Sequence, residues 1–206
     1  MKKTILLFAM VFCLGVAGYA QHGLHGIIKA SYDTKDPSML ISDIQHDVDD
    51  GAVNFIKKCN AELGLRYQTR LGLYIETGIA VSVNSVWDSV VSQSGSFWER
   101  AKNTFTYTQG LQFTLPVYAG WNFPIGDAND LAFRVYVGPE FYSTVGDLKE
   151  FKLNFNTYSL AAGVGVDLFN GISLDAKATY FMASQKGLTA IEKNELFYTI
   201  SIGFLL

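Results

Sequence analysis

The sequence contains almost no cysteine and no long apolar run after its first 20 residues. Only two of the 206 residues are cysteine. Cys13 lies in the apolar segment at the start, so Cys59 is the single cysteine of the mature chain and an internal disulfide is not expected. No later segment approaches the roughly 20 apolar residues that a membrane-spanning helix needs. If the mature chain crosses a membrane, it must do so as a closed barrel, because only helices and closed barrels pair every backbone group in lipid.

The sequence also lacks an excess of basic residues and the common catalytic and metal-binding motifs. It has 16 basic and 19 acidic residues, a net charge of −3, without a basic patch, so nucleic acid is not expected as a partner. No His-x-x-x-His or Cys-x-x-Cys spacing occurs, and we expect neither a metal nor a cofactor. No nucleophile-elbow, phosphate-loop or dinucleotide motif stands in a suitable context, so an enzyme is not expected.

The first 20 residues have the pattern of a secretory signal peptide. Lys2 and Lys3 precede an apolar run over residues 5–17, and Gly18-Tyr19-Ala20 forms a small-x-small cleavage site. We therefore expect residues 1–20 to be removed and residues 21–206 to form one domain, a length that suits a single domain.

Apolar residues alternate with small or polar ones throughout the mature chain. The pattern is clearest in the last ten residues, where the larger apolar side chains are Tyr198, Ile200, Ile202, Phe204 and Leu206. A period of two predicts a β-strand with one apolar face. Eight such strands are predicted, at residues 24–33, 58–69, 71–83, 105–123, 131–144, 154–168, 172–183 and 197–206. Pairing the last strand with the first would close a barrel and remove its exposed edges.

The predicted connections alternate between long and short. The long ones follow the odd-numbered strands, at residues 34–57, 84–104, 145–153 and 184–196. The short ones follow the even-numbered strands, at Arg70, Pro124–Asp130 and Phe169–Gly171. Short periplasmic turns and long extracellular loops are typical of outer-membrane barrels. The predicted fold is therefore all-β, a single eight-stranded antiparallel up-and-down transmembrane barrel located in the cell outer membrane.

Three local features follow from the strand phase. Matching the outward faces of strands six and seven requires a three-residue loop at 169–171, with Gly171 left-handed in a bulge. Pro116 and Pro139 lie almost opposite each other inside strands, so we expect a bulge or a missing ladder bond there. Apolar residues at helical spacing over 40–48 leave two alternatives for the first long loop, a short amphipathic helix or a mobile loop.

Aromatic side chains on the outward face are expected to form two girdles at the headgroup level. The girdle near the long loops comprises Tyr32, Trp87, Phe105, Tyr107, Phe141, Tyr158, Tyr180 and Tyr198. The girdle near the short turns comprises Tyr67, Trp121, Phe123, Phe133 and Phe204.

The same phase places four basic and four acidic residues on the inward face. They are Lys29, Glu62, Arg66, Glu76, Arg134, Glu140, Asp175 and Lys177. Such charges would be strongly unfavourable in lipid, whereas inside a narrow barrel they can pair. We interpret them as a structural charge network, and a catalytic or proton-relay cluster is the weaker interpretation. Inward-facing glycines would make room for the long side chains, and side chains just fill an eight-stranded barrel, so a plugged interior is predicted.

Several segments in order resemble one family, the PorT-like outer-membrane β-barrel proteins of Bacteroidetes. They are Leu115-Pro116-Val117, Val135–Pro139, Ala161–Val166, Leu174–Tyr180 and Tyr198–Phe204. The resemblance covers essentially the whole mature chain and implies the barrel fold and an outer-membrane location. One namesake of the family takes part in a protein secretion system. Such barrels usually end on an aromatic residue read by the assembly machinery, and Leu206 departs from that pattern.

The leading functional hypothesis is a non-catalytic integral barrel with long extracellular loops, serving a structural, surface-binding, envelope or secretion role. Its expected partners are outer-membrane lipid, lipopolysaccharide, the barrel assembly machinery and an envelope or secretion protein. A narrow porin-like channel for small solutes is the alternative. Two further hypotheses stay open, a soluble periplasmic lipid-binding barrel and a rim enzyme that would use His46 with Ser42, Asp43 or Asp47.

Overall fold

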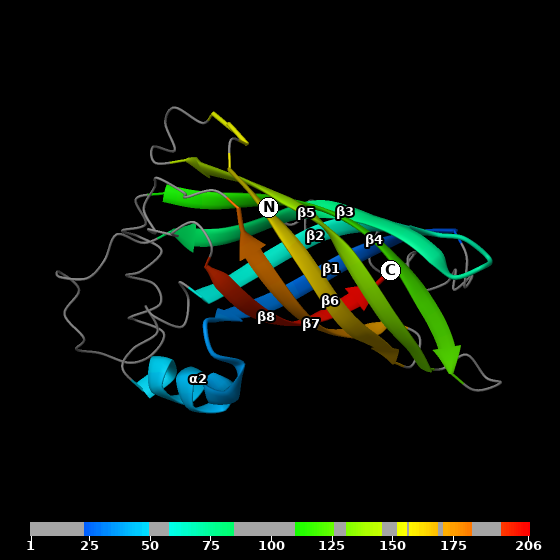
Figure 1. Ribbon diagram of the computed structural model, residues 1–206, viewed down its shortest axis with the longest axis horizontal. Coiled ribbons are helices and arrows are strands. Elements are labelled where there is room, and N and C mark those ends of the chain that lie inside the picture. Colours follow the sequence, from blue (N-terminus) through cyan, green and yellow to red (C-terminus); the bar gives the residue numbers. More distant parts are fainter. Residues whose placement is uncertain are drawn as a thin grey trace, which may run out of the picture.

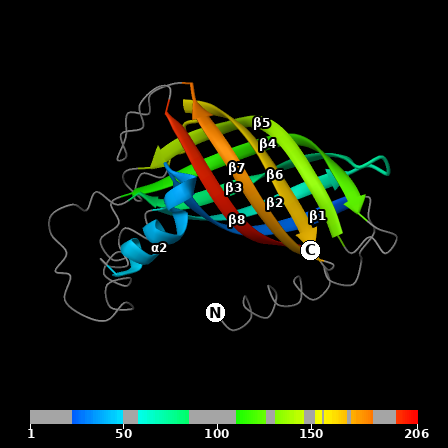
Figure 2. The ribbon, with the colours of Figure 1, turned by 60° about the horizontal axis from the view of Figure 1, so that its bottom comes forward.

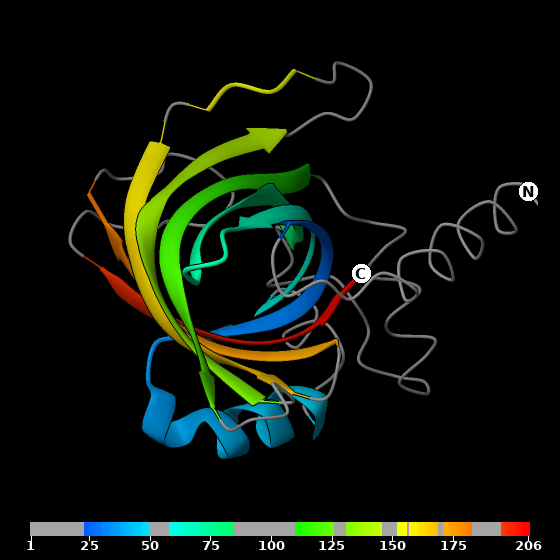
Figure 3. The same ribbon diagram turned by 90° about the vertical axis from the view of Figure 1, so that its right-hand side faces the viewer.

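Eight antiparallel strands close into a barrel in the computed structural model (Figure 1). The structure describes residues 23–49, 58–84, 110–125, 131–145, 152–155, 157–168, 171–182 and 195–206. The strands are β1 (Gly23–Thr34), β2 (Cys59–Gln68), β3 (Leu73–Asn84), β4 (Gly110–Ile125), β5 (Leu131–Val145), β6 (Thr157–Leu168), β7 (Ile172–Phe181) and β8 (Leu196–Leu205). Viewed towards one end, the strands form a single ring (Figure 3). The predicted fold class is confirmed, and the predicted signal peptide lies outside the described residues.

The first and last strands complete the barrel. β8 pairs with β7 along one edge and with β1 along the other. Gly26 and Leu206 exchange two backbone hydrogen bonds, of 3.1 and 2.8 Å, so the pairing continues to Leu206. The closure predicted from the alternation in residues 197–206 is therefore correct.

The two faces of the strands differ sharply in chemistry. In β8, Ile200, Ile202 and Phe204 are exposed, whereas the alternate residues between them are buried. No outward position of the eight described strands carries a charged side chain. The outer wall is thus an apolar band, as the sequence phase predicts.

The expected aromatic girdles are found in part. Near the short turns, all five predicted aromatics are exposed on the outer wall, namely Tyr67, Trp121, Phe123, Phe133 and Phe204. Near the long loops, Tyr158 and Tyr180 are also exposed. The expectation for Tyr32 is wrong: it is only 7% exposed, and the Lys58 ammonium lies 5.7 Å from its ring centroid. Three predicted members lie outside the described residues, namely Trp87, Phe105 and Tyr107.

A helix follows β1 at the barrel end that carries the connections after odd-numbered strands, which we call the long-loop end. A 3-10 turn at Pro37–Met39 leads into α2 (Leu40–Asp49), outside the barrel and near β1 and β8 (Figure 2). The short helix, one of the two alternatives for this loop, is confirmed, and Ile41 on it is 81% exposed. Within the described ranges, no helix is long and apolar enough to cross a membrane.

Several strand ends differ from the prediction. β4 continues to Ile125 rather than ending at 123, and β7 ends at Phe181 rather than at 183. β6 begins at Thr157 rather than at 154. The reason at β6 is local, because the Asn154 N–H donates to the Ser143 hydroxyl (2.7 Å) instead of joining a strand ladder. The predicted start of strand four, at 105–109, lies outside the described residues.

The β2–β3 turn is longer than the single residue Arg70 that was expected. The Thr69 N–H donates to the Leu73 carbonyl (2.8 Å), and the Gly72 N–H donates to the Thr69 carbonyl (3.0 Å). Gly72 has a φ of 82°, which glycine adopts without the strain a side chain would add. The loop is therefore Arg70–Gly72, and Gly72 belongs to a bulged three-residue turn rather than to the inner face.

The β6–β7 turn has the predicted length. Leu168 pairs with Ile172, which leaves the three residues 169–171 between them. Gly171 has a positive φ of 145°, although this value is far from the left-handed helical one that was expected. The outward phase of the two flanking strands therefore fixed the loop length correctly.

Two prolines interrupt the hydrogen-bond ladders of β3, β4 and β5. The β3–β4 register skips the positions at which Gly78 would face Pro116, and the β4–β5 register skips those at which Val117 would face Pro139. The offset between strands is the same on both sides of each gap, so no extra residue is inserted. A proline has no N–H to donate, which explains both gaps. The predicted missing ladder bond is confirmed, and the alternative of a bulge is not found.

A lipid-facing hydroxyl compensates for part of this interruption. The Thr77 side chain, exposed on the outer wall, donates a hydrogen bond of 2.9 Å to the Pro116 carbonyl. An unpaired carbonyl in a hydrocarbon environment costs several kcal/mol. Thr77 thus satisfies a carbonyl beside the gap.

Gly138 allows β4 and β5 to approach each other at the proline interruption. A Cβ atom on Gly138 would overlap the Val117 carbonyl oxygen and lie 2.9 Å from the Tyr118 Cα. We predict that Gly138→Ala lowers the free energy of unfolding by about 1–3 kcal/mol or more. Urea titration of the protein folded in lipid vesicles measures this loss. Gly26→Ala is the matched control, because the nearest atom to its added Cβ is 3.4 Å away. Equal losses in the two variants would contradict the close approach.

Candidate functional site

Six charged side chains form a closed ring of ion pairs across the lumen. In order they are Lys29, Glu76, Arg66, Asp167, Arg134 and Asp175. Cations and anions alternate around the ring, so its net charge is zero. We call this set the ion-pair ring. Its members come from β1, β2, β3, β5, β6 and β7, so the ring connects strands that do not neighbour one another in the sheet.

The two arginines hold most of the ring together. The Arg66 Nε donates a hydrogen bond of 2.8 Å to Glu76 Oε2, and its Nη2 lies 2.7 Å from the same oxygen. The Arg66 Nη1 lies 3.1 Å from Asp167 Oδ2. The Arg134 Nε lies 3.0 Å from Asp167 Oδ1, and the Arg134 Nη2 lies 2.9 Å from Asp175 Oδ1. The guanidinium fork suits such double contacts because it presents several donors in one plane.

A lysine completes the ring. Lys29 makes a close contact with Glu76 and lies 3.7 Å from Asp175. The ring is almost entirely shielded from water, since Arg134 is 0% and Arg66 and Glu76 are each 1% exposed. Buried charges of this kind are tolerable only when each one is paired.

A second cluster surrounds Glu140, which is also buried. Its carboxylate accepts close hydrogen bonds from Tyr118, Tyr142 and Lys177. It accepts two longer ones, both of 3.3 Å, from the hydroxyls of Ser159 and Thr179. Five donors from β4, β5, β6 and β7 thus converge on one carboxylate, and we call this set the Glu140 cluster.

Tyrosine rings fill the lumen beside these charges. The rings of Tyr118 and Tyr136 lie 5.0 Å apart between centroids, and the Arg66 guanidinium lies 4.9 Å from the Tyr74 ring centroid. Tyr74, Tyr118 and Tyr136 pack in one buried cluster together with Ala161. The tyrosines therefore give the charged groups an apolar surrounding that excludes water, and cation–π contact contributes to this packing.

Glycines opposite the long side chains make the space for them, as the sequence predicts. Arg134 pairs across the strands with Gly165, and Lys29 pairs with Gly203. A Cβ atom on Gly165 would lie 2.7 Å from an Arg134 nitrogen, and one on Gly203 would lie 2.8 Å from the Lys29 Cγ. Arg134 and Lys29 therefore each lie over a position that has no side chain.

The structure places the eight predicted charged residues in these two networks with one exception. Five belong to the ion-pair ring, and Glu140 and Lys177 belong to the Glu140 cluster. Arg66 and Glu76 pair across β2 and β3, as expected. The exception is Glu62, which faces Lys29 in the register but whose Oε1 has no hydrogen-bond partner in the described part of the chain.

Sequence reasoning missed two inward acidic residues, Asp33 and Asp167. Asp167 bridges both arginines of the ring, and Asp33 accepts hydrogen bonds of 2.7 Å each from Asn60 and Thr199. The phase that placed Val166 and Leu168 outward already pointed Asp167 inward, so the signal was present. The expected balance of four and four is therefore wrong. The described strands carry four basic and six acidic residues on the inner face.

The arrangement is suited to holding strands together rather than to acid–base chemistry. The ring carboxylates are paired with cations, and Glu140 accepts five hydrogen bonds. No group of three or more His, Cys, Asp or Glu side chains in the described ranges is arranged to hold a metal ion. His46 and Asp47, two residues of the rim-enzyme hypothesis, lie in α2.

The fold and the distribution of charge define the class of protein. A closed antiparallel barrel with an apolar, charge-free outer wall and charges confined to its lumen is a transmembrane β-barrel. The family described as "Outer membrane protein beta-barrel domain" matches residues 4–204, so this chain belongs to that family. No curated protein sequence matches it closely enough to count as a relative.

Solved outer-membrane barrels resemble the chain at low identity. Neisserial surface protein A is 12% identical, covering 92% of this chain and 98% of its own, with a TM-score of 0.47. The N-terminal barrel domain of Pseudomonas aeruginosa OprF is 11% identical, with 90% and 100% covered and a TM-score of 0.43. Ail of Yersinia pestis is 14% identical, with 90% and 99% covered and a TM-score of 0.39. Similarity at this level carries no statement about function.

Asp167 offers the sharpest test of the ion-pair ring. Asp167→Asn leaves both arginines facing a neutral amide, and breaking a buried ion pair in this way costs about 3–5 kcal/mol. We predict a loss of that size in the free energy of unfolding, measured by urea titration in lipid vesicles. The control is Lys35→Gln, which removes the exposed 2.8 Å pair with Glu195 and should cost no more than about 1 kcal/mol. A loss no greater at Asp167 than at Lys35 would contradict the role of the ring.

Proposed function

We propose that this protein is a non-catalytic, non-conducting barrel of the outer membrane that presents a partner-binding surface at its long-loop end. The observation that carries the proposal is the filled lumen. The ion-pair ring, the Glu140 cluster and the buried tyrosines occupy the space through which a solute would have to pass. Side chains are expected to fill an eight-stranded barrel in this way.

The role of the charged residues in this proposal is structural. The ring joins six strands, and the Glu140 cluster joins four, so together they fix the shape of the barrel from within. A rigid barrel is a suitable support for binding segments, because binding residues are often found on loops that a rigid scaffold positions.

The uneven length of the connections supports a binding surface at one end. At the long-loop end the strands are joined by residues 35–58, 85–109, 146–156 and 182–195. At the opposite end, which we call the short-turn end, they are joined by residues 69–72, 126–130 and 169–171. In outer-membrane barrels the short turns are periplasmic and the longer loops extracellular. The proposed binding surface would therefore face the cell exterior.

The expected partners follow from this placement. Outer-membrane phospholipid and lipopolysaccharide would surround the wall, and the barrel assembly machinery would insert the exported chain. The segments that resemble PorT-like proteins support an envelope or secretion assembly as the class of protein partner. This finer assignment rests on the sequence resemblance alone.

A narrow channel for small cations is the second candidate. It is favoured by one observation, the surplus of two acidic residues on the inner face of the described strands. Within the described strands, Asp33 and Glu62 are the inward acids that form no ion pair, and Glu62 is only partly buried. The channel would nevertheless require the buried ring to open.

Planar-bilayer recording separates the two candidates. We predict that the purified protein gives no steady current above the bilayer baseline in salt solution, because the ring and the Glu140 cluster block the lumen. A general porin inserted in the same bilayers is the positive control. Reproducible single-channel steps from the purified protein would contradict the proposal and support the channel.

Crosslinking in intact cells tests the binding surface. We predict that replacing residues 85–109 by a short turn abolishes a crosslinked protein partner of the wild type. The matched control replaces residues 126–130 at the short-turn end and should retain that partner. Heat-modifiable gel migration must show that both variants fold. Retention of the partner after loss of 85–109, or its absence in the wild type, would count against this role.

A further inference from the structure

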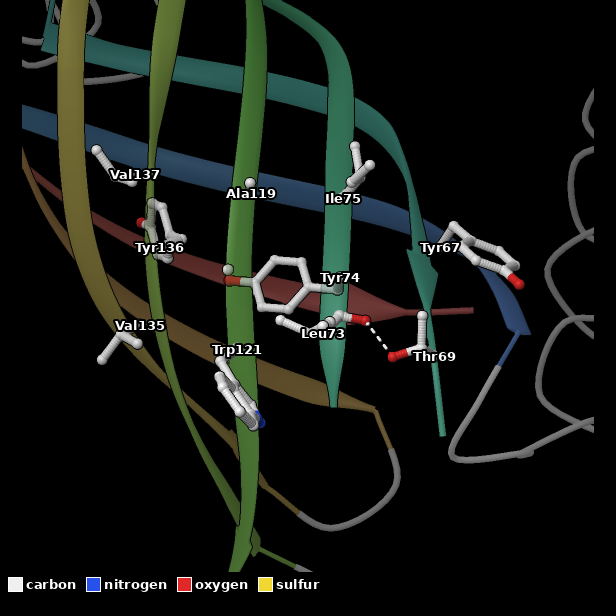
Figure 4. Close-up of a pocket in the computed structure, with 11 residues that line it drawn as sticks. Tyr67, Thr69, Leu73, Tyr74, Ile75, Ala119, Trp121, Val135, Tyr136 and Val137 are labelled. Carbon is white, nitrogen blue, oxygen red and sulfur yellow. Dashed lines mark hydrogen bonds between the residues drawn. The ribbon is translucent and has the colours of Figure 1, made fainter. Parts of the chain in front are cut away.

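The outer wall carries a groove across β3, β4 and β5, close to the short-turn end. Its volume is 740 Å³, and it is lined mainly by outward apolar side chains (Figure 4). Ala119 lies between Ile75 and Val137 in the register and in the figure. The small side chain of Ala119 leaves a hollow between the larger outward side chains of the neighbouring strands.

The groove changes in polarity along the strands. The residues nearest the β2–β3 turn are Tyr67, Thr69 and Trp121, which supply a phenol, a hydroxyl and an indole N–H. The Thr69 hydroxyl donates to the Leu73 carbonyl at 3.0 Å, as drawn in Figure 4. Farther from the turn, at Ala119 and Val137, the lining is wholly apolar. Tyr and Trp favour the level of the lipid headgroups, so the polar end of the groove corresponds to the membrane interface.

We propose that this groove binds one acyl chain of a glycerophospholipid from the periplasmic leaflet. The family places the barrel in the outer membrane, and the short turns place the groove in its periplasmic half. The chain would lie over Ala119, and its ester region would lie beside Tyr67 and Trp121. This order, polar at the interface and apolar towards the membrane centre, matches the order of groups along a phospholipid.

A concave site holds an acyl chain better than the convex wall elsewhere on a barrel. The wall of a barrel curves away from a straight chain, whereas a groove contacts it on several sides. Each such contact is weak, but their number decides the affinity. The groove lies on the outer wall, so lipid binding there does not depend on whether the lumen conducts. A failure of this inference is therefore distinguishable from a failure of the proposed function.

Native mass spectrometry of the full-length protein provides the test. The protein is delipidated in dodecyl maltoside and then offered palmitoyl-oleoyl phosphatidylethanolamine. We expect the wild type to retain one lipid and Ala119→Phe, which fills the groove, to retain it about tenfold more weakly. The matched control is Ala176→Phe, which places the same ring on the outer wall of β7, away from the groove. Equal retention in the two variants would overturn the proposal. The proposal would also be overturned if the protein extracted from cells, before delipidation, carried lipid A or a peptide instead of a phospholipid.

A measurement on an unfilled groove keeps the proposal testable if Ala119→Phe does not fold. Trp87→Phe with Trp98→Phe leaves Trp121 as the sole tryptophan. The reference protein lacks all three native tryptophans and carries Ala176→Trp on the outer wall of β7. In dodecyl maltoside, we expect dibrominated phosphatidylethanolamine to quench the fluorescence of Trp121 at a lower mole fraction than it quenches the fluorescence of the reference protein. Coinciding quenching curves would mean that the groove is ordinary lipid-facing wall and would overturn the proposal.

Discussion

The exclusion of charge from the membrane-facing wall is the constraint on which the rest of this structure depends. Every charged side chain of the eight described strands points into the lumen. Because the lumen of an eight-stranded barrel is narrow, those charges are also removed from water, and each needs a partner. The ion-pair ring meets this requirement by alternating three cations with three anions, and the Glu140 cluster meets it with five donors on one carboxylate. The same inward charged side chains therefore stabilise the barrel through their ion pairs and fill its lumen.

The backbone is adapted to the same requirement. Gly165 and Gly203 leave room for Arg134 and Lys29, while Gly138 lets β4 and β5 approach where two prolines interrupt the ladder. An interrupted ladder is unfavourable in lipid, and the Thr77 hydroxyl satisfies the Pro116 carbonyl from the outer wall. Just beyond this interruption, Ala119 opens the groove that we assign to an acyl chain. The irregular features of the barrel are thus concentrated in β3, β4 and β5.

Period-two alternation was sufficient to predict the strand number, the closure and the inward direction of the charges. It fixes which face a residue occupies but not the side-chain contacts, so the ring of six could not be foreseen from sequence. The predicted network did not include Asp167, although the alternation that places Val166 and Leu168 outward points Asp167 into the lumen. The predicted β2–β3 turn was too short because Gly72 was assigned to a strand, whereas Gly72, with its positive φ, belongs to the turn. Tyr32 was expected to face lipid, yet burial at a strand end depends on chain segments that a strand pattern does not describe.

The most direct test of the account is the hydrogen exchange of the arginine side chains, followed by NMR in lipid bilayers. Arg66 and Arg134 lie in the buried ring, while Arg70 is exposed at the β2–β3 turn and serves as an internal reference. The account predicts that the Nε–H protons of Arg66 and Arg134 exchange with solvent far more slowly than that of Arg70. Exchange of all three at similar rates would mean that water fills the lumen, and the ring as described would be contradicted.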